Sequence, residues 1–221
     1  MPLAWLSFGL RPGQRVATSR GDAVVRRPGG GTLRSPDGRI VVCDPYLCAG
    51  APAPVGALHV RPPGEATTTR AARREATAMQ FRTTVCTLRF AAPELGERNT
   101  GAIVHAHDVS ARDAVAGVTR WEPALSAAGD PFAYGVDHGV ACFIGGETQT
   151  KIATSERHHR TIERDLSVRD HHHGVIDFKG GATLEWFDSG LGDGHYAVWW
   201  GLDDAGLRRC LATDFAVFGS S

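Results

Sequence analysis

The last forty residues of the chain are divided into short β-prone runs by turns rich in glycine and aspartate. Runs of β-branched and aromatic residues occupy 183–187, 195–202 and 207–218. The turns between them, 188–194 and 203–206, supply residues that tolerate unusual backbone dihedrals. Because strands joined by such short connections pair with their sequence neighbours, this region predicts an antiparallel three-stranded meander.

The same β signature recurs along most of the chain, and helical patterns are few. The other β-prone segments are 39–43, 57–60, 81–90, 103–107, 119–122, 132–136 and 140–144. Two segments favour helices: 147–166, which contains no glycine or proline, and 111–117, which follows the capping pattern of Ser110 and Asp113. We therefore predict a mainly β protein, an antiparallel β-sandwich or open barrel with one or two peripheral helices.

The N-terminal part of the chain has a different composition. Residues 10–38 are rich in glycine, proline and arginine and include the run Pro28-Gly29-Gly30-Gly31. That composition is typical of a loop, so we expect residues 1–37 to form a flexible or loosely packed N-terminal arm. Residues 38–221 show no clean internal boundary, and a chain of 221 residues fits one domain. We therefore expect a single β-rich domain over 38–221.

Composition argues against several classes of protein. Lys and Arg total 24, as do Asp and Glu, so the chain lacks the basic excess that binds nucleic acid phosphates. It contains no run of about 18 apolar residues that would span a membrane, and its N-terminus lacks the basic region and cleavage site of a signal peptide. Five scattered cysteines without a CxxC pair favour reduced, semi-buried thiols. We expect a cytoplasmic protein that binds neither nucleic acid nor membrane.

A set of short segments spread over residues 38–218 forms a recognisable pattern. Its C-terminal members are Gly192-Asp193-Gly194-His195-Tyr196, Trp200-Gly201-Leu202-Asp203 and Thr213-Asp214-Phe215. Its upstream members are Gly38 to Pro45, Arg120-Trp121-Glu122 and Tyr134-Gly135-Val136-Asp137. In this order they resemble a bacterial family catalogued only as a domain of unknown function, with a C-terminal GDGxYxxxWGxD…DF signature. Segments 61–80, 91–117 and 147–175 have no counterpart in that pattern. The resemblance implies no activity, because the family has no general biochemical role.

Four acidic residues stand at predicted strand ends or in turns: Asp44, Glu122, Asp137 and Asp193. Carboxylates at strand ends can meet at one edge of a sheet, where they bind a divalent cation or divide into a general acid and a general base. We expect Glu122 or Asp137 to be the general base, Asp193 to bind a cation or orient the substrate, and Asp44 to contact the substrate. The alternative is structural: Asp44 and Asp193 cap turns, and Glu122 pairs with an arginine.

The glycine-rich turn of the C-terminal signature is the second candidate feature. Gly192 and Gly194 free the backbone for the close approach of a ligand, and His195, which follows, can act as a base or a ligand. Tyr196 and Trp200 supply aromatic surface that we expect to contact the substrate. The structural alternatives are a tight hairpin, a histidine that faces solvent, and aromatic rings packed in the core.

The chain has ten histidines, more than its length leads one to expect. His105 and His107 would share one face of a strand, an arrangement that can chelate Zn²⁺. His171, His172 and His173 lie in a polar stretch, where solvation is the simplest expectation. No HExxH motif is present.

The sequence favours an enzyme without assigning its reaction. It contains no GxSxG motif, P-loop or GxGxxG opening a helix, which argues against serine hydrolases, P-loop enzymes and Rossmann oxidoreductases. We expect a small soluble enzyme of hydrolase or lyase type that acts on a small-molecule substrate through its carboxylates, with a divalent cation as a candidate cofactor. The alternative is a non-catalytic binding or immunity-like accessory protein that presents the aromatic meander to a protein partner.

Overall fold

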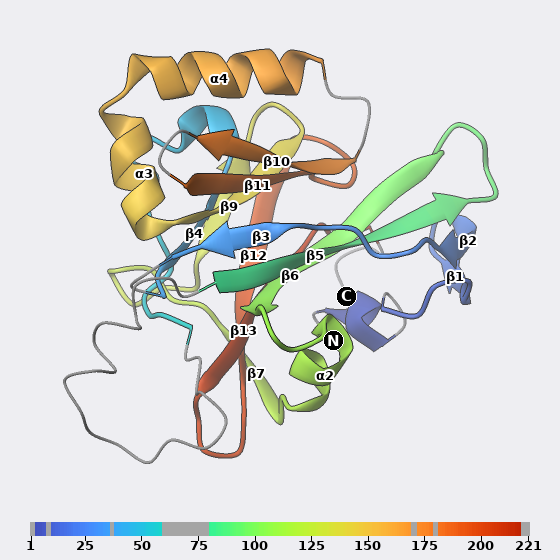
Figure 1. The fold of residues 1–221 in the computed structure, drawn as a ribbon. Helices are drawn as coiled ribbons and strands as arrows, with labels where there is room; N and C mark the ends of the chain where they lie inside the picture. Colours follow the sequence, from blue (N-terminus) through green and yellow to red (C-terminus); the bar gives the residue numbers. More distant parts are fainter. Residues whose placement is uncertain are drawn as a thin grey trace.

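The computed structural model describes residues 3–7, 10–35, 38–58, 80–168, 172–178 and 181–217. Within these residues thirteen strands form two antiparallel sheets, and neither sheet closes into a barrel. The sheets face each other, and two helices cover the outer face of one of them (Figure 1). The predicted antiparallel β-sandwich is confirmed. The expected strand over 57–60 lies partly outside the described residues.

The larger sheet has nine strands. Its main path runs through β1 (Arg15–Thr18), β2 (Gly21–Val25), β5 (Gln80–Phe90), β6 (Glu97–Ala106), β13 (Arg208–Asp214), β12 (Gly194–Leu202) and β7 (Arg120–Pro123). Two strands lie off this path: β3 (Thr32–Arg34) pairs with β5, and β8 (Ala133–Val136) pairs with β12. The short helix α2 (Ala111–Ala116) begins after its cap Ser110, close to β6 and β13.

The smaller sheet has four strands, in the order β10 (His173–Phe178), β11 (Ala182–Asp188), β9 (Val140–Gly145) and β4 (Ile40–Cys43). Successive side chains on these strands point to opposite faces. Val42, Phe143 and Phe187 pack into the main core between the sheets, whereas Val41 and Ile144 join a second core under the helices. Because both faces are covered, β4 and β9 are buried along their whole length, which explains their continuously apolar sequences.

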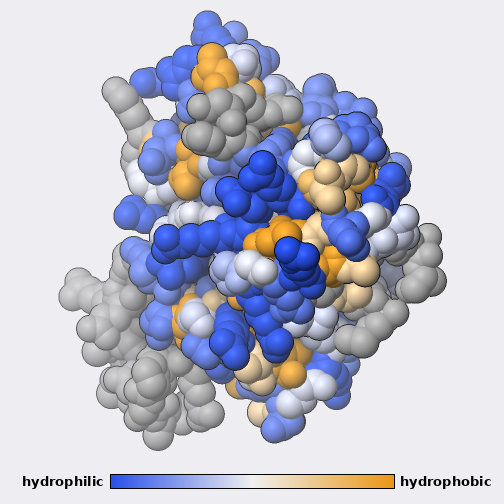
Figure 2. All heavy atoms as spheres, turned by 90° about the vertical axis from the view of Figure 1, so that its right-hand side faces the viewer, coloured by the Kyte–Doolittle hydropathy of each residue, from blue (hydrophilic) through white to orange (hydrophobic). Residues whose placement is uncertain are grey.

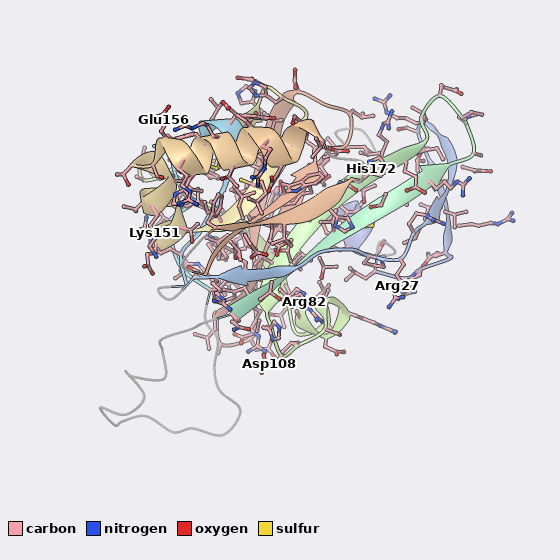
Figure 3. All side chains as sticks on the ribbon, turned by 45° about the horizontal axis from the view of Figure 1, so that its top comes forward. Arg27, Arg82, Asp108, Lys151, Glu156 and His172 are labelled. Atoms are coloured by element: carbon pink, nitrogen blue, oxygen red, sulfur yellow. The ribbon has the colours of Figure 1, made fainter. Side chains whose placement is uncertain are left out.

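Two helices, α3 (Gly146–Ala153) and α4 (Glu156–Ser167), close the second core. The sequence predicts one helix over 147–166, but the structure interrupts it at Thr154 and Ser155, where the backbone of Ser155 is extended. The hydroxyl of Thr154 donates to carbonyl oxygens of the preceding turn, a local bond that competes with continuation of the helix. Lys151 and Glu156 flank the resulting corner (Figure 3).

The segment for which composition predicts a loosely packed arm contains three strands, β1, β2 and β3. The long strand β5 offers backbone groups to both β2 and β3, which pair with its two ends. Val25, Leu33 and, from the 3-10 helix η1 (Ala4–Ser7), Trp5 lie in the main core. The three consecutive glycines, Gly29 to Gly31, belong to the connection between β2 and β3, where a Cβ at Gly30 would lie 1.9 Å from a backbone carbonyl oxygen of β5. The composition reflects close packing rather than looseness.

The C-terminal strands are divided between the two sheets instead of forming one meander. β12 and β13 pair as predicted, but β11 pairs with β9 and β10 in the smaller sheet. The connection from Asp188 to Gly194 is long enough to carry the chain from one sheet to the other. The ends of the described chain meet in the larger sheet, where the backbone N–H of Leu3 donates to the carboxylate of Asp214 at 3.0 Å.

The surface carries no large apolar patch on the face drawn in Figure 2, where hydrophobic side chains lie in small groups among hydrophilic ones. None of the described helices is long and apolar enough to cross a membrane. Among the residues that the structure describes, the exposed large apolar ones are Val24, Leu47, Val55, Leu125, Val168, Val175 and Leu191.

Candidate functional site

Asp44 is the most deeply buried of the predicted site residues, and its side chain is fully removed from solvent. It follows β4 and caps the 3-10 helix η2 (Pro45–Leu47), where Oδ1 accepts from the backbone N–H of Tyr46 at 2.9 Å. Oδ2 accepts from the backbone N–H of Asp137 and from Nδ1 of His138, both at 3.0 Å. Three donors therefore hold this buried carboxylate in one orientation and compensate its lost hydration.

His138 is the residue of this site that the sequence analysis missed. Its side chain is 49% exposed, and its ring packs on Tyr46 with the centroids 4.5 Å apart. Because a carboxylate only accepts, Nδ1 carries the proton in the hydrogen bond to Asp44. In a neutral ring Nε2 is then the nitrogen that carries the lone pair, as in a carboxylate–histidine catalytic dyad. The available signal was its position beside Asp137, in a turn between two β-prone runs.

Two turns meet beside His138. The backbone N–H of Gly139 donates to Oδ1 of Asp193 at 2.8 Å. In the opposite direction, the N–H of Ser189 donates to the carbonyl oxygen of Gly139 at 3.0 Å. The structure thus brings three of the four candidate carboxylates to one end of the sandwich. The contact of Asp193 is with the backbone, which is the behaviour of a turn cap.

The loop before β12 is held from inside the core. The buried phenol of Tyr196 donates to the carbonyl oxygens of Ser189 and Gly192, at 2.8 and 2.6 Å, and burial raises its pKa. Tyr196 therefore positions this loop instead of lining a surface for substrate. Gly192 has a φ of 114°, as the turn requires, whereas Gly194 is the first residue of β12. The side chain of His195 is exposed on the outer face of β12, beside β8.

Glu122 and Trp200 lie elsewhere in the molecule. They are opposite each other on β7 and β12, about 20 Å along the strand from the first residue of β12. The carboxylate of Glu122 is 50% exposed and pairs with Nε of Arg120 at 2.7 Å. Trp200 is buried in the main core, with the guanidinium of Arg208 5.1 Å from its ring centroid. Neither side chain belongs to the group around Asp44.

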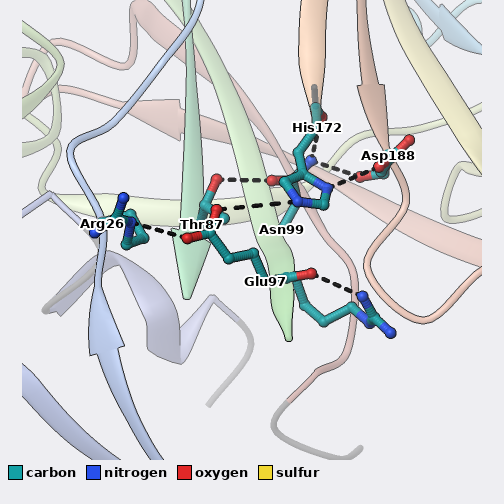
Figure 4. Close-up of polar contacts among 7 residues, drawn as sticks. Arg26, Thr87, Glu97, Asn99, His172 and Asp188 are labelled. Atoms are coloured by element: carbon teal, nitrogen blue, oxygen red, sulfur yellow. Dashed lines mark hydrogen bonds and ion pairs between the residues drawn. The ribbon is translucent and has the colours of Figure 1, made fainter. Parts of the chain in front are cut away.

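A second histidine lies between carboxylates where β6 approaches β11 (Figure 4). Nδ1 of His172 is 3.0 Å from Oδ2 of Asp188, and Nε2 is 4.0 Å from Oε2 of Glu97. Glu97 also pairs with Nε of Arg26 at 3.0 Å. Because both ring nitrogens are directed at carboxylates, this arrangement favours an ionic link between the sheets over a catalytic base. The expectation of a merely solvated histidine missed this link.

Asn99 supports the same cluster from the core. Its fully buried side chain donates through Nδ2 to the carbonyl oxygens of His172 and Asp188, at 2.7 and 2.9 Å. Its Oδ1 accepts from the hydroxyl of Thr87 at 2.8 Å. One amide group therefore holds the backbone of both partners of the ion pair.

His105 is a core residue and not half of a chelating pair. Its Nε2 lies 3.2 Å from the hydroxyl of Thr84, and burial lowers the pKa of its ring to about 4. His107 follows the last residue of β6 and is exposed. The two rings do not share a strand face, because the strand ends between them.

Three cysteines that are far apart in the sequence meet next to Asp44. Cys43, Cys48 and Cys142 are the only group of three metal-binding side chains, among the described residues, whose ligand atoms lie within 4.8 Å of one another. All five cysteines of the chain are buried and free. No CxxC motif marks the cluster, because its last member follows Cys48 by 94 residues.

The model of one protein family, described as a protein of unknown function (DUF4241), matches residues 33–213. This range begins in β3 and ends in β13, so it contains the smaller sheet together with Asp44 and His138. No curated protein and no solved structure matches the chain. Since the match covers well over half of the 221 residues, the chain belongs to this family of proteins of unknown function, DUF4241.

Proposed function

We propose that this protein is a small enzyme of hydrolase or lyase type in which His138 acts as the general base. The observation that carries the proposal is the hydrogen bond from Nδ1 of this exposed histidine to the fully buried carboxylate of Asp44. An ordinary surface ion pair leaves both groups in solvent. Here the carboxylate is enclosed and the imidazole is half exposed, which is the asymmetry that an oriented base requires.

The catalytic cycle follows from this geometry. Nε2 of His138 takes a proton from a water molecule or from the substrate, and the ring becomes an imidazolium. Asp44 stabilises that charge, and its other two donors prevent the carboxylate from turning away. The imidazolium then returns the proton to the leaving group, which restores the starting state. The role of base thus falls to His138 rather than to Glu122 or Asp137.

The side chains around His138 indicate the kind of substrate. Asp137 and Asp193 are exposed and lie in the two turns beside it. Their carboxylates favour a small-molecule substrate with a cationic or hydrogen-bond-donating group. Among the described residues, Asp137 and Asp193 do not form, with a third histidine or carboxylate, a group whose ligand atoms all lie within 4.8 Å of one another. A cation held jointly with substrate oxygens stays a candidate cofactor.

The alternative of a non-catalytic or immunity-like binding protein is the weaker proposal. It needs aromatic side chains that a protein partner can reach. In the described part of the C-terminal strands Trp186, Phe187, Tyr196 and Trp200 are buried and Trp199 is partly exposed, so these strands offer little aromatic surface for such a contact.

We also propose a bacterial and cytoplasmic setting, with no nucleic acid or membrane as partner. The equal numbers of basic and acidic residues and the five free thiols support it. The GDGxYxxxWGxD…DF segment is our proposed family signature. Its aspartate caps a turn and its tyrosine anchors the loop, so the pattern has a structural reason.

The test compares turnover by the wild-type protein and by His138→Gln on a panel of chromogenic carboxylic esters, phosphoesters and glycosides. We expect a loss of about 100-fold or more for His138→Gln and for Asp44→Asn. His195→Gln is the matched control, because it removes an exposed histidine outside the pair. A folded His138→Gln variant that retains wild-type turnover would refute the role.

A second measurement needs no substrate. Long-range ¹⁵N–¹H spectra of the histidine rings report which nitrogen carries the proton. We expect the Nδ1–H tautomer for His138 in the wild-type protein. A neutral ring with its proton on Nε2 would contradict the proposed base.

A further inference from the structure

Three buried thiols converge behind Asp44, on the face of the smaller sheet that the helices cover. Cys43 and Cys142 are directly opposite each other in the pair of β4 and β9, and both belong to the second core. η2 then turns the chain back, so that Sγ of Cys48 lies 2.9 Å from Sγ of Cys43 and 3.5 Å from Sγ of Cys142. The sulfurs of Cys43 and Cys142 are 3.7 Å apart. Two strands and one turn thus supply a triangle of sulfur atoms.

The triangle is close to the size of a thiolate set around a small cation. Zinc–sulfur bonds in a tetrahedral site place neighbouring sulfurs about 3.8 Å apart. Both distances to Cys142 are already near that value. The distance between Cys43 and Cys48 is shorter, yet well beyond the S–S bond of a disulfide, which is about 2.05 Å. A small outward movement of Cys48, which lies on a turn, would complete the set.

The surroundings of the thiols favour a bound cation. The three sulfurs are enclosed in a core whose other members, such as Val41 and Ile152, are apolar, so thiolates there need a cation as their partner. A buried charge is costly unless it is paired, and a cation among the sulfurs would supply the partner.

A histidine of α4 is placed to become a fourth ligand. α4 lies against η2, and the half-buried imidazole of His159 is close enough to Cys48 for the two side chains to interact electrostatically. His159 lies outside the compact group of three, so binding requires a rotation of its side chain. Gln149 of α3 donates to the carbonyl oxygens of Cys48 and Ala51, at 3.0 and 2.6 Å, and steadies the turn that carries the third sulfur.

We propose that Cys43, Cys48 and Cys142 bind one Zn²⁺ ion as thiolates, with His159 completing a Cys₃His set. Thiolate ligands select such a cation over hard ions like Mg²⁺ or Ca²⁺. Four protein ligands leave no open position, so the ion is structural and fastens η2 to β4 and β9. This site is separate from the proposed acid–base pair, since none of its ligands is Asp44 or His138.

The experiment measures the metal content of the full chain, purified without a histidine tag under reducing conditions in the presence of zinc. We expect one zinc per chain after gel filtration. Replacement by Co²⁺ should give the thiolate-to-metal charge-transfer absorption of a tetrahedral sulfur site. Cys48→Ser should lose the metal, and Cys86→Ser, which changes a buried cysteine outside the cluster, should keep it. His159→Ala should retain the thiolate absorption but bind zinc at least about 10-fold more weakly, because even outer-shell partners contribute that much.

Three outcomes would overturn the proposal. The first is a wild-type protein that holds no zinc and gives no charge-transfer band with Co²⁺, although all thiols are free to react once it is unfolded. The second is a disulfide between Cys43 and Cys48 in freshly isolated protein, seen by mass. The third is equal loss of zinc from Cys86→Ser and Cys48→Ser. If Cys48→Ser does not fold, the wild-type Co²⁺ spectrum and His159→Ala still decide. These readouts are independent of turnover, so failure here leaves the test of His138 intact.

Discussion

Glu185 allows a sharp test of how this sandwich responds to pH. It lies on β11, its side chain packs against Gly31, and it is only 2% exposed. Its Oε1 has no hydrogen-bond partner among the described residues. Burial, with a smaller contribution from the nearby charge of Asp177, raises the pKa of Glu185 from 4.5 to about 8. The carboxyl group is therefore protonated at neutral pH in the folded protein and ionised in the unfolded chain.

The sign and size of the effect follow from proton linkage. Between pH 4.5 and about 8, the folded state keeps a proton on Glu185 that the unfolded state has already lost. The free energy of unfolding therefore falls as the pH rises through this interval. The stabilisation that comes from the bound proton is fully present below pH 4.5. Each pH unit is worth about 1.4 kcal/mol. The whole interval corresponds to ~5 kcal/mol, which is an upper bound because local opening relaxes the ionised state.

The assay is urea denaturation followed by tryptophan fluorescence, with wild type and Glu185→Gln compared from about pH 5 to about pH 9. Glutamine keeps the shape of the protonated carboxyl but cannot ionise. We expect similar stabilities near pH 5 and a variant that is more stable than wild type by several kcal/mol near pH 9. Glu122→Gln, which changes an exposed carboxylate, should follow the wild-type pH dependence. A difference between wild type and Glu185→Gln that stays constant within ~0.5 kcal/mol would refute the reasoning.

Three further predictions concern stability. Asp44→Ala leaves three donors without their acceptor and should lower the free energy of unfolding in urea by about 3 kcal/mol or more, whereas Glu122→Gln should change it by less than ~0.5 kcal/mol. Asn99→Ala removes three hydrogen bonds in the core and should lower the free energy of unfolding by ~2–3 kcal/mol in the same assay. An unchanged urea midpoint would show that these hydrogen bonds do not stabilise the protein. Gly101→Ala places a Cβ 2.3 Å from a buried tryptophan ring, so it should lower the thermal midpoint at a cost in stability of ~1–3 kcal/mol. Gly117→Ala, whose new Cβ has its nearest contact at 3.6 Å, should leave the midpoint unchanged. Equal midpoints for the two variants would contradict the packing argument.

The candidate site shows which of its features local sequence patterns can predict. Asp44, Asp137 and Asp193 were recognisable because each stands in a turn beside a β-prone run, and turns at one end of a sandwich lie near one another. Glu122 fits the same description but lies on β7, opposite Trp200, which is six residues from the start of β12. A turn-and-strand pattern does not contain the register of distant strands, and register decided which carboxylates converge.

The chain's own sequence determined the positions of most strands, because alternation and turn residues act over a few neighbouring positions. The sequence alone also shows that the chain contains no GxSxG motif, P-loop or GxGxxG motif opening a helix. Only the tertiary structure decided that β11 leaves the C-terminal strands for the other sheet, and that the glycine-rich N-terminal segment packs along β5. It alone placed Cys142 opposite Cys43 and aimed His138 at a buried carboxylate. These decisions depend on burial and pairing between segments up to 99 residues apart, which no local pattern encodes.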